Sequence, residues 1–138
     1  MQNRSANNPR KSTLRQRRRK ANKNVAHGRI YIQSTFNNVI ITVTDTKGNV
    51  IAWNSAGSAG FKGAKKSTPY AATQTAKNVI EKVKELGLQE ANISISGVGN
   101  GREAAVRAFA GSGIRITGVK DTTPIPHNGC RPKKPRRV

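Results

Sequence analysis

The chain has 138 residues, which is enough for one domain and too few for two ordinary ones. Its net charge is +20, from 26 Lys and Arg against 6 acids, and no stretch approaches the roughly 18 consecutive apolar residues of a membrane helix. The single cysteine, Cys130, excludes an internal disulfide and fits a reducing compartment.

The charge is concentrated at the two ends. Residues 1–29 and 122–138 hold ten and five Lys and Arg with no acid, whereas all six acids lie within residues 30–121. This predicts a globular domain over 30–121, a basic N-terminal arm over 1–29 and a basic, Pro-rich C-terminal tail over 122–138. Such arms repel themselves and need a polyanion. Nucleic acid is favoured over a membrane, because the arms have no apolar face.

The N-terminal arm contains a solid basic block. Its predicted RNA contacts are Arg15, Arg17, Arg18, Arg19 and Lys20. A cleaved organelle transit peptide is the alternative, since those are also Arg-rich, but the segment has no apolar periodicity. We therefore interpret it as a retained arm, with a hinge to the domain over residues 22–28.

Three strands are predicted in the first half of the domain, over residues 30–33, 39–44 and 50–53. Apolar and polar residues alternate in these segments, which is typical of half-buried strands. Asn37-Asn38 and Lys47-Gly48-Asn49 are turn residues between them. Short turns between consecutive strands predict an antiparallel meander.

Two helices and two strands follow. Thr68-Pro69 begins a helix that Gly87 ends, because Thr caps and Pro favours the first helical position. A strand over 92–96, a helix from Asn100 with Glu103 completing a cap, and a strand over 114–119 complete the domain. This order predicts a single α/β domain, with a five-stranded mixed sheet, two main helices and basic extended arms.

A long loop over residues 54–67 combines three glycines with three lysines. The predicted phosphate contacts are Lys62, Lys65 and Lys66, in preference to a merely solvated loop. Phe61 in the same loop either stacks on a partner or anchors the loop.

A second glycine-rich loop joins a predicted strand to a predicted helix. Its predicted RNA contacts are Gly97, Gly99, Gly101 and Arg102, because free backbone N–H groups and the helix dipole favour an anion there. The spacing is that of neither a dinucleotide fingerprint nor a nucleotide triphosphate loop. The alternative is that the glycines only permit a tight turn.

The C-terminal tail is rich in Pro and basic residues, so it is predicted to stay extended and to follow an RNA groove. Its predicted contacts are His127, Asn128, Arg131, Lys133, Lys134, Arg136 and Arg137. With His27, the tail's His127 and Cys130 are the only His and Cys, too few for a structural zinc site. No metal or other cofactor is expected.

Catalysis is not expected either. Asp45 and Asp121 stand alone at strand ends, and a two-metal nuclease needs several converging carboxylates. The six aromatic residues are scattered, which we interpret as giving no stacking platform for single strands. Recognition of RNA backbone and shape is the remaining interpretation. A ribonuclease H-like nuclease and a free-standing RNA or DNA chaperone are the alternatives.

Several motifs together resemble one family, small-subunit ribosomal protein eleven of the bacterial and organellar type, over residues 28–138. The motifs in the first part are Ile41-Thr42-Val43-Thr44-Asp45, Gly48, Trp53, Ser55-Ala56-Gly57, Gly60-Phe61-Lys62-Gly63 and Thr68-Pro69-Tyr70-Ala71-Ala72. Those in the second part are Gly99, Gly101-Arg102-Glu103, Asp121, Thr123-Pro124 and Pro126-His127-Asn128-Gly129-Cys130-Arg131-Pro132.

The resemblance implies a ribonuclease H-like topology used without its chemistry. It further implies a structural role on the platform of the small subunit, bridging helices of ribosomal RNA beside the cleft where mRNA pairs with the end of that RNA. The implied neighbours are small-subunit ribosomal proteins seven and eighteen, with initiation factor three as a further contact. The implied location is a ribosome of the cytoplasm or of an organelle, with no membrane partner.

Overall fold

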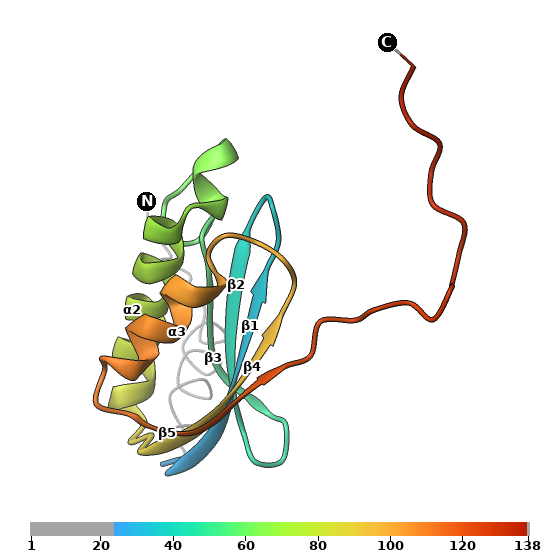
Figure 1. Cartoon of the computed structure of the whole chain (residues 1–138). Helices are drawn as coiled ribbons and strands as arrows, with labels where there is room; N and C mark the ends of the chain where they lie inside the picture. The colour runs from blue at the N-terminus through green and yellow to red at the C-terminus, as the bar shows by residue number, and fades with distance from the viewer. Residues whose placement is uncertain (1–23, 138) are drawn as a thin grey trace, which may run out of the picture.

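The computed structural model describes residues 24–137, in which one mixed sheet carries its helices on a single face (Figure 1). The strands are β1 (His27–Ser34), β2 (Val39–Asp45), β3 (Val50–Ser55), β4 (Glu90–Ser96) and β5 (Arg115–Asp121). The helices are the short 3-10 helix η1 (Gly63–Ser67), α2 (Pro69–Glu85) and α3 (Arg102–Ala110). The predicted α/β architecture, with five strands and two main helices, is confirmed.

The strand order is β3-β2-β1-β4-β5. The β1–β2 and β2–β3 pairs are antiparallel, as predicted for a meander, and the β1–β4 and β4–β5 pairs are parallel. Consequently β1, β3, β4 and β5 all end at the same side of the sheet, which we name the carboxyl edge. The segments that follow β3, β4 and β5 are residues 56–67, residues 97–101 and the C-terminal tail, so all three start from this edge.

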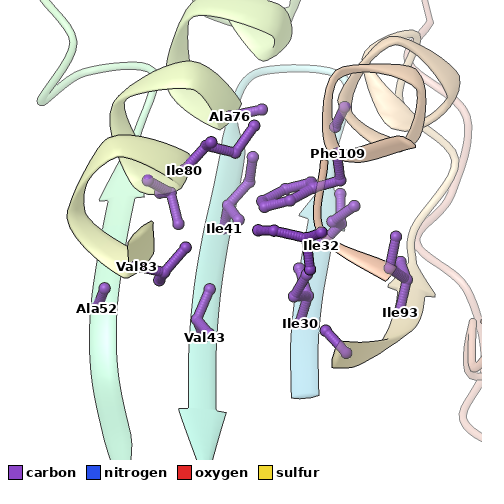
Figure 2. Close-up of a cluster of buried hydrophobic side chains, with 14 of the residues drawn as sticks. Ile30, Ile32, Ile41, Val43, Ala52, Ala76, Ile80, Val83, Ile93 and Phe109 are labelled. Carbon is purple, nitrogen blue, oxygen red and sulfur yellow. The ribbon is translucent and has the colours of Figure 1, made fainter. Parts of the chain in front are cut away.

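The core lies between the sheet and the two helices. In β1, Ile30 and Ile32 are buried while Tyr31 and Gln33 are exposed, as the alternation predicts. Figure 2 shows Ile30, Ile32, Ile41 and Val43 on the covered side of β1 and β2, with Phe109 of α3 next to Ile32. The buried face of α2 has the predicted helical spacing and includes Ala72, Ala76, Val79, Ile80 and Val83. Burial within residues 24–137 is therefore one-sided, and no helix of this range lies on the opposite face of the sheet.

The start of α2 agrees with the sequence prediction, whereas the start of α3 does not. The Thr68 hydroxyl accepts a hydrogen bond from the Ala71 N–H at 3.2 Å, and Pro69 occupies the first turn. In α3 the first flanking residue is Gly101 and no side chain caps the helix, so the predicted cap by Asn100 and Glu103 is wrong. Glu103 instead pairs with Arg107 one turn later, at 3.6 Å.

The predicted hinge is partly wrong. The Val25 N–H donates to the Leu86 carbonyl oxygen at 3.1 Å, and the Ala26 carbonyl oxygen accepts from the N–H groups of Gln89 and Glu90. β1 then begins at His27, before the expected position at Ile30. Residues from Val25 onward thus belong to the fold, and the first two residues of the hinge, 22 and 23, lie outside the described residues.

The second glycine loop is pressed against the end of β1. Gly97 has a φ of +96°, and a Cβ atom there would overlap the Ser34 carbonyl oxygen. The Gly99 N–H donates to that same oxygen at 3.0 Å. A Cβ atom on Gly101 would lie 2.8 Å from both Ala72 Cβ and Val39 Cγ2. This contact also explains the missing side-chain cap, because close packing of Gly101 determines where α3 begins.

Replacing Phe109 by Ala should strongly destabilise the domain, because this side chain is fully buried between α3 and the sheet. A loss of about 3–5 kcal/mol in the free energy of unfolding is expected for such a cavity. Denaturant unfolding followed by circular dichroism measures it. The control Val98→Ala, at an exposed apolar residue, should change stability by less than about 0.5 kcal/mol.

Gly97→Ala should cost more stability than Gly60→Ala. Both glycines have nearly the same positive φ, +96° and +99°, so both substitutions carry a backbone strain of about 1–3 kcal/mol. Nothing lies within 4 Å of a Cβ on Gly60, whereas Gly97 also meets the backbone of β1, which adds about 1–3 kcal/mol. Equal losses in denaturant unfolding would show that the loop moves away from β1 without cost.

Candidate RNA interface

The lysine-rich segment over residues 56–67 is ordered by contacts with the carboxyl edge. The Ala56 N–H donates to the Val39 carbonyl oxygen at 3.0 Å, and the Phe61 N–H donates to the Ala56 carbonyl oxygen at 3.1 Å. Phe61 meets Tyr70 edge to face, with 5.8 Å between ring centroids. Of the two roles considered for Phe61, the structure shows the anchor, which fixes the segment to the start of α2.

The lysines of this segment are available to a partner. Lys62 and Lys65 are exposed and Lys66 is half-buried. The ion pairs found within residues 24–137 involve only His27, Arg102, Arg107 and Arg115 as cations, so no acid there neutralises the three lysines. An ordered backbone with unopposed ammonium groups is suited to a phosphate surface. Contact of Lys62, Lys65 and Lys66 with RNA stays a prediction.

The second glycine loop offers fewer donors than its sequence indicates. The Gly97 N–H donates a hydrogen bond to the Thr123 hydroxyl oxygen at 3.2 Å, and the Gly99 N–H donates to the Ser34 carbonyl oxygen. Gly99 and Gly101 are buried, so the alternative role of the glycines, a tight turn, describes what they do in the structure. Any anion at this loop would have to use the N–H groups around the start of α3. Gly97, Gly99 and Gly101 as RNA contacts therefore stay a prediction.

Arg102 and Asp121 connect this loop to the beginning of the tail. The Arg102 guanidinium donates to the Gly97 carbonyl oxygen at 2.8 Å and forms an ion pair with Asp121. The Asp121 carboxylate also accepts from the Thr123 hydroxyl and N–H, at 2.6 and 2.9 Å. These Thr123 bonds, followed by that from Arg102, hold the pKa of Asp121 well below its usual range, so the carboxylate stays charged at neutral pH.

The sequence did not predict this link between Arg102 and Asp121, which we name the clasp, and it gives Arg102 an intramolecular role. Its guanidinium already serves two intramolecular acceptors, so Arg102 fixes the direction in which the tail leaves β5. Within the described residues, the basic side chains of the lysine-rich segment and of the tail are in no ion pair. Arg102 as a direct RNA contact stays a prediction.

The C-terminal tail extends away from the domain (Figure 1). Every residue from Pro124 to Arg137 is exposed, including the predicted contacts His127, Asn128, Arg131, Lys133, Lys134, Arg136 and Arg137. Asn128 has a positive φ of 62°, which forms a local bend, and Cys130 is exposed. An extended basic segment that is exposed along its length and in no ion pair within residues 24–137 is expected to bind a polyanion.

The acids of the described chain do not form a catalytic or metal site. Asp45 closes the β2–β3 turn by accepting from the N–H groups of Lys47 and Asn49, each at 2.9 Å. Hydrogen bonds from Asn49 lower the pKa of Asp45. Within residues 24–137 no group of three or more His, Cys, Asp and Glu side chains gathers in a way that could hold a metal ion.

Some predicted features lie outside the described residues. These are the arm contacts Arg15, Arg17, Arg18, Arg19 and Lys20, which stay predictions. Among the residues that are described, no helix has the length and apolar character needed to cross a membrane.

Comparison with known proteins identifies the family. The family model described as Ribosomal protein S11 matches residues 28–137. The chain is 54% identical to the small ribosomal subunit protein uS11 of Borreliella burgdorferi (strain ZS7) over 121 residues, which are 88% of this chain and 93% of that protein. It is 56% identical to uS11 of Sulfurovum sp. (strain NBC37-1) over 122 residues, 88% and 98% of the two chains. The chain therefore belongs to the ribosomal protein S11 family.

Proposed function

We propose that the chain binds small-subunit ribosomal RNA through the carboxyl edge of its sheet, with the N-terminal arm and C-terminal tail as additional contacts. As a family member it is a structural ribosomal protein of the small subunit and not an enzyme, which answers the nuclease alternative. The observation that carries the proposal is the convergence of Lys62, Lys65 and Lys66 with the glycine loop and the tail at one edge. No described acid opposes those lysines there.

The distribution of charge supports one broad contact rather than a single pocket. RNA helices present rows of phosphates, and basic side chains at separate points of an edge meet several rows together. The tail adds five Lys and Arg on an exposed, extended backbone. We therefore propose that the chain bridges more than one helix of the ribosomal RNA.

The position of this contact follows from the family resemblance. We propose the platform of the small subunit, beside the cleft where mRNA pairs with the end of the ribosomal RNA. The proposed protein neighbours are small-subunit ribosomal proteins seven and eighteen, and initiation factor three during initiation. The chain is ribosome-bound, and a cytoplasmic ribosome is proposed over an organellar one.

Replacing Lys62, Lys65 and Lys66 together by Ala should weaken binding to small-subunit ribosomal RNA and leave the fold intact. Loss of up to three phosphate contacts should reduce the slope of log affinity against log salt concentration by roughly two to three. Filter binding over a salt series measures the slope.

A matched control is the triple change of Lys47, Lys77 and Lys84 to Ala. The control removes the same charge from three exposed lysines, which lie on the β2–β3 turn and on α2. The control variant should keep most of the salt-dependence slope of the unchanged protein. If the two triple variants reduce the slope equally, the lysines of the carboxyl edge make no specific contact, and only the net charge of the chain matters.

Deleting residues 1–23 should weaken RNA binding and reduce its salt dependence, because this segment holds nine Lys and Arg and no acid. Each phosphate contact contributes roughly 0.7–0.9 to the slope of log affinity against log salt concentration. If all nine basic residues contact phosphate, the deletion should reduce this slope by about six to eight. The same salt series measures it. An unchanged slope would show that the arm does not touch phosphate.

A further inference from the structure

The proposed function assigns no role to the sheet face opposite α2 and α3. We name it the open face and define it by the outward residues of the five strands. These are Arg29, Tyr31 and Gln33 of β1, Ile40 and Thr42 of β2, Trp53 of β3, Asn92 and Ser94 of β4, and Lys120 of β5. No described helix covers it (Figure 1).

Two aromatic side chains stand in one row across this face. The strand register pairs Trp53 with Thr42, and Thr42 with Tyr31. Both aromatics therefore point away from the helices, about 10 Å apart, with the short Thr42 between them. Trp53 is 54% exposed and Tyr31 39% exposed, which is unusual for large rings in a folded domain. Two of the six aromatic residues are thus placed in one row by the meander.

The same row continues with polar and basic residues. Tyr31 pairs with Ser94, and Ser94 pairs with Lys120 at the edge strand β5. Arg29 lies one row away on β1, and neither Arg29 nor Lys120 is in an ion pair within the described residues. The aromatic end of the row is therefore followed by hydrogen-bonding groups and then by positive charge.

Among the described residues, one acid lies at the margin of the open face: Glu90, the first residue of β4. Its carboxylate pairs with the Arg115 guanidinium at 3.2 Å and also contacts the His27 ring at 3.3 Å. The remaining charge of the face is positive, which favours a polyanion over a basic or neutral partner. Charged residues are depleted at the centre of protein–protein contacts, whereas this row continues from the two rings through Ser94 to Lys120.

We propose that the open face binds unpaired nucleotides of RNA, with bases stacked on Trp53 and Tyr31 and phosphates near Arg29 and Lys120. Exposed aromatics on a sheet are a recurrent surface for unpaired bases, since every base presents a π-face. This inference rests on the proposed function, because it adds a second and chemically different RNA contact to the one at the carboxyl edge. The edge binds backbone, and the open face binds bases.

Trp53 is the only tryptophan of the chain, so its fluorescence reports the open face directly. The test titrates the full chain with a single-stranded oligoadenylate of roughly ten nucleotides, a length within the range bound by known single-strand-binding folds. Fluorescence anisotropy of a label on the RNA measures binding in parallel. Quenching of Trp53 emission over the same concentration range as the anisotropy change is expected, and a duplex of equal length should quench far less.

Substitutions separate stacking from charge. Trp53→Ala and Tyr31→Ala should each weaken oligoadenylate binding on the order of tenfold, the size of one lost base stack. Trp53→Phe and Tyr31→Phe keep a ring and should retain most of the affinity. Phe36→Ala is the matched control, because Phe36 is 70% exposed but lies in the β1–β2 turn. Circular dichroism verifies that each variant is folded.

Two results would overturn the inference. One is saturation of the anisotropy with no change in Trp53 emission, which would leave the proposed function standing because RNA still binds. The other is a change of Trp53 emission that occurs only when the chain is assembled into the small subunit and not when RNA is added alone. Photo-crosslinks from the open face would then reach protein instead of RNA. Failure of the proposed function is measured separately, because the two lysine triples would then affect the salt dependence of ribosomal RNA binding equally.

Discussion

Burial of one face of the sheet under α2 and α3 is the constraint on which the remaining features depend. Ile30, Ile32, Ile41 and Val43 can all be buried only if β1 and β2 keep one register and both helices lie on the same side. Removal of this much apolar surface is the main stabilising contribution available to a chain with so much positive charge. The same one-sidedness leaves the opposite face to polar, basic and aromatic residues.

The direction of the strands then determines where loops can gather. Because β1, β3, β4 and β5 run in the same direction, the segments that follow these four strands all begin at the carboxyl edge. The glycine loop fits there only because it packs without side chains on Ser34 and on the start of α2. That packing also places Gly101 against Ala72, in the first turn of α2. Stability of the core and position of the candidate interface are therefore coupled.

Much of this fold was predictable from the sequence, because strand alternation and helical spacing are local patterns. The strands near Ile30, Val39 and Val50 and the Thr68-Pro69 helix start follow from such patterns. The cap predicted from Asn100 and Glu103 was wrong because a tertiary contact, Gly101 against Val39 and Ala72, decided the start of α3. The Arg102–Asp121 clasp was equally inaccessible, since it joins residues 19 positions apart through the sheet.

The position of the two aromatic residues on the open face was also not predictable from local sequence patterns. Tyr31 and Trp53 are separated in sequence by a whole strand and two turns, so their spacing indicates nothing about a shared face. The meander brings them into one row through Thr42. Counterion release makes contacts with phosphate strongly salt-dependent, whereas stacking depends on ring area and is less sensitive to salt. A domain that uses one edge for charge and one face for stacking can hold RNA in a defined orientation, because the two contacts restrain different directions of movement.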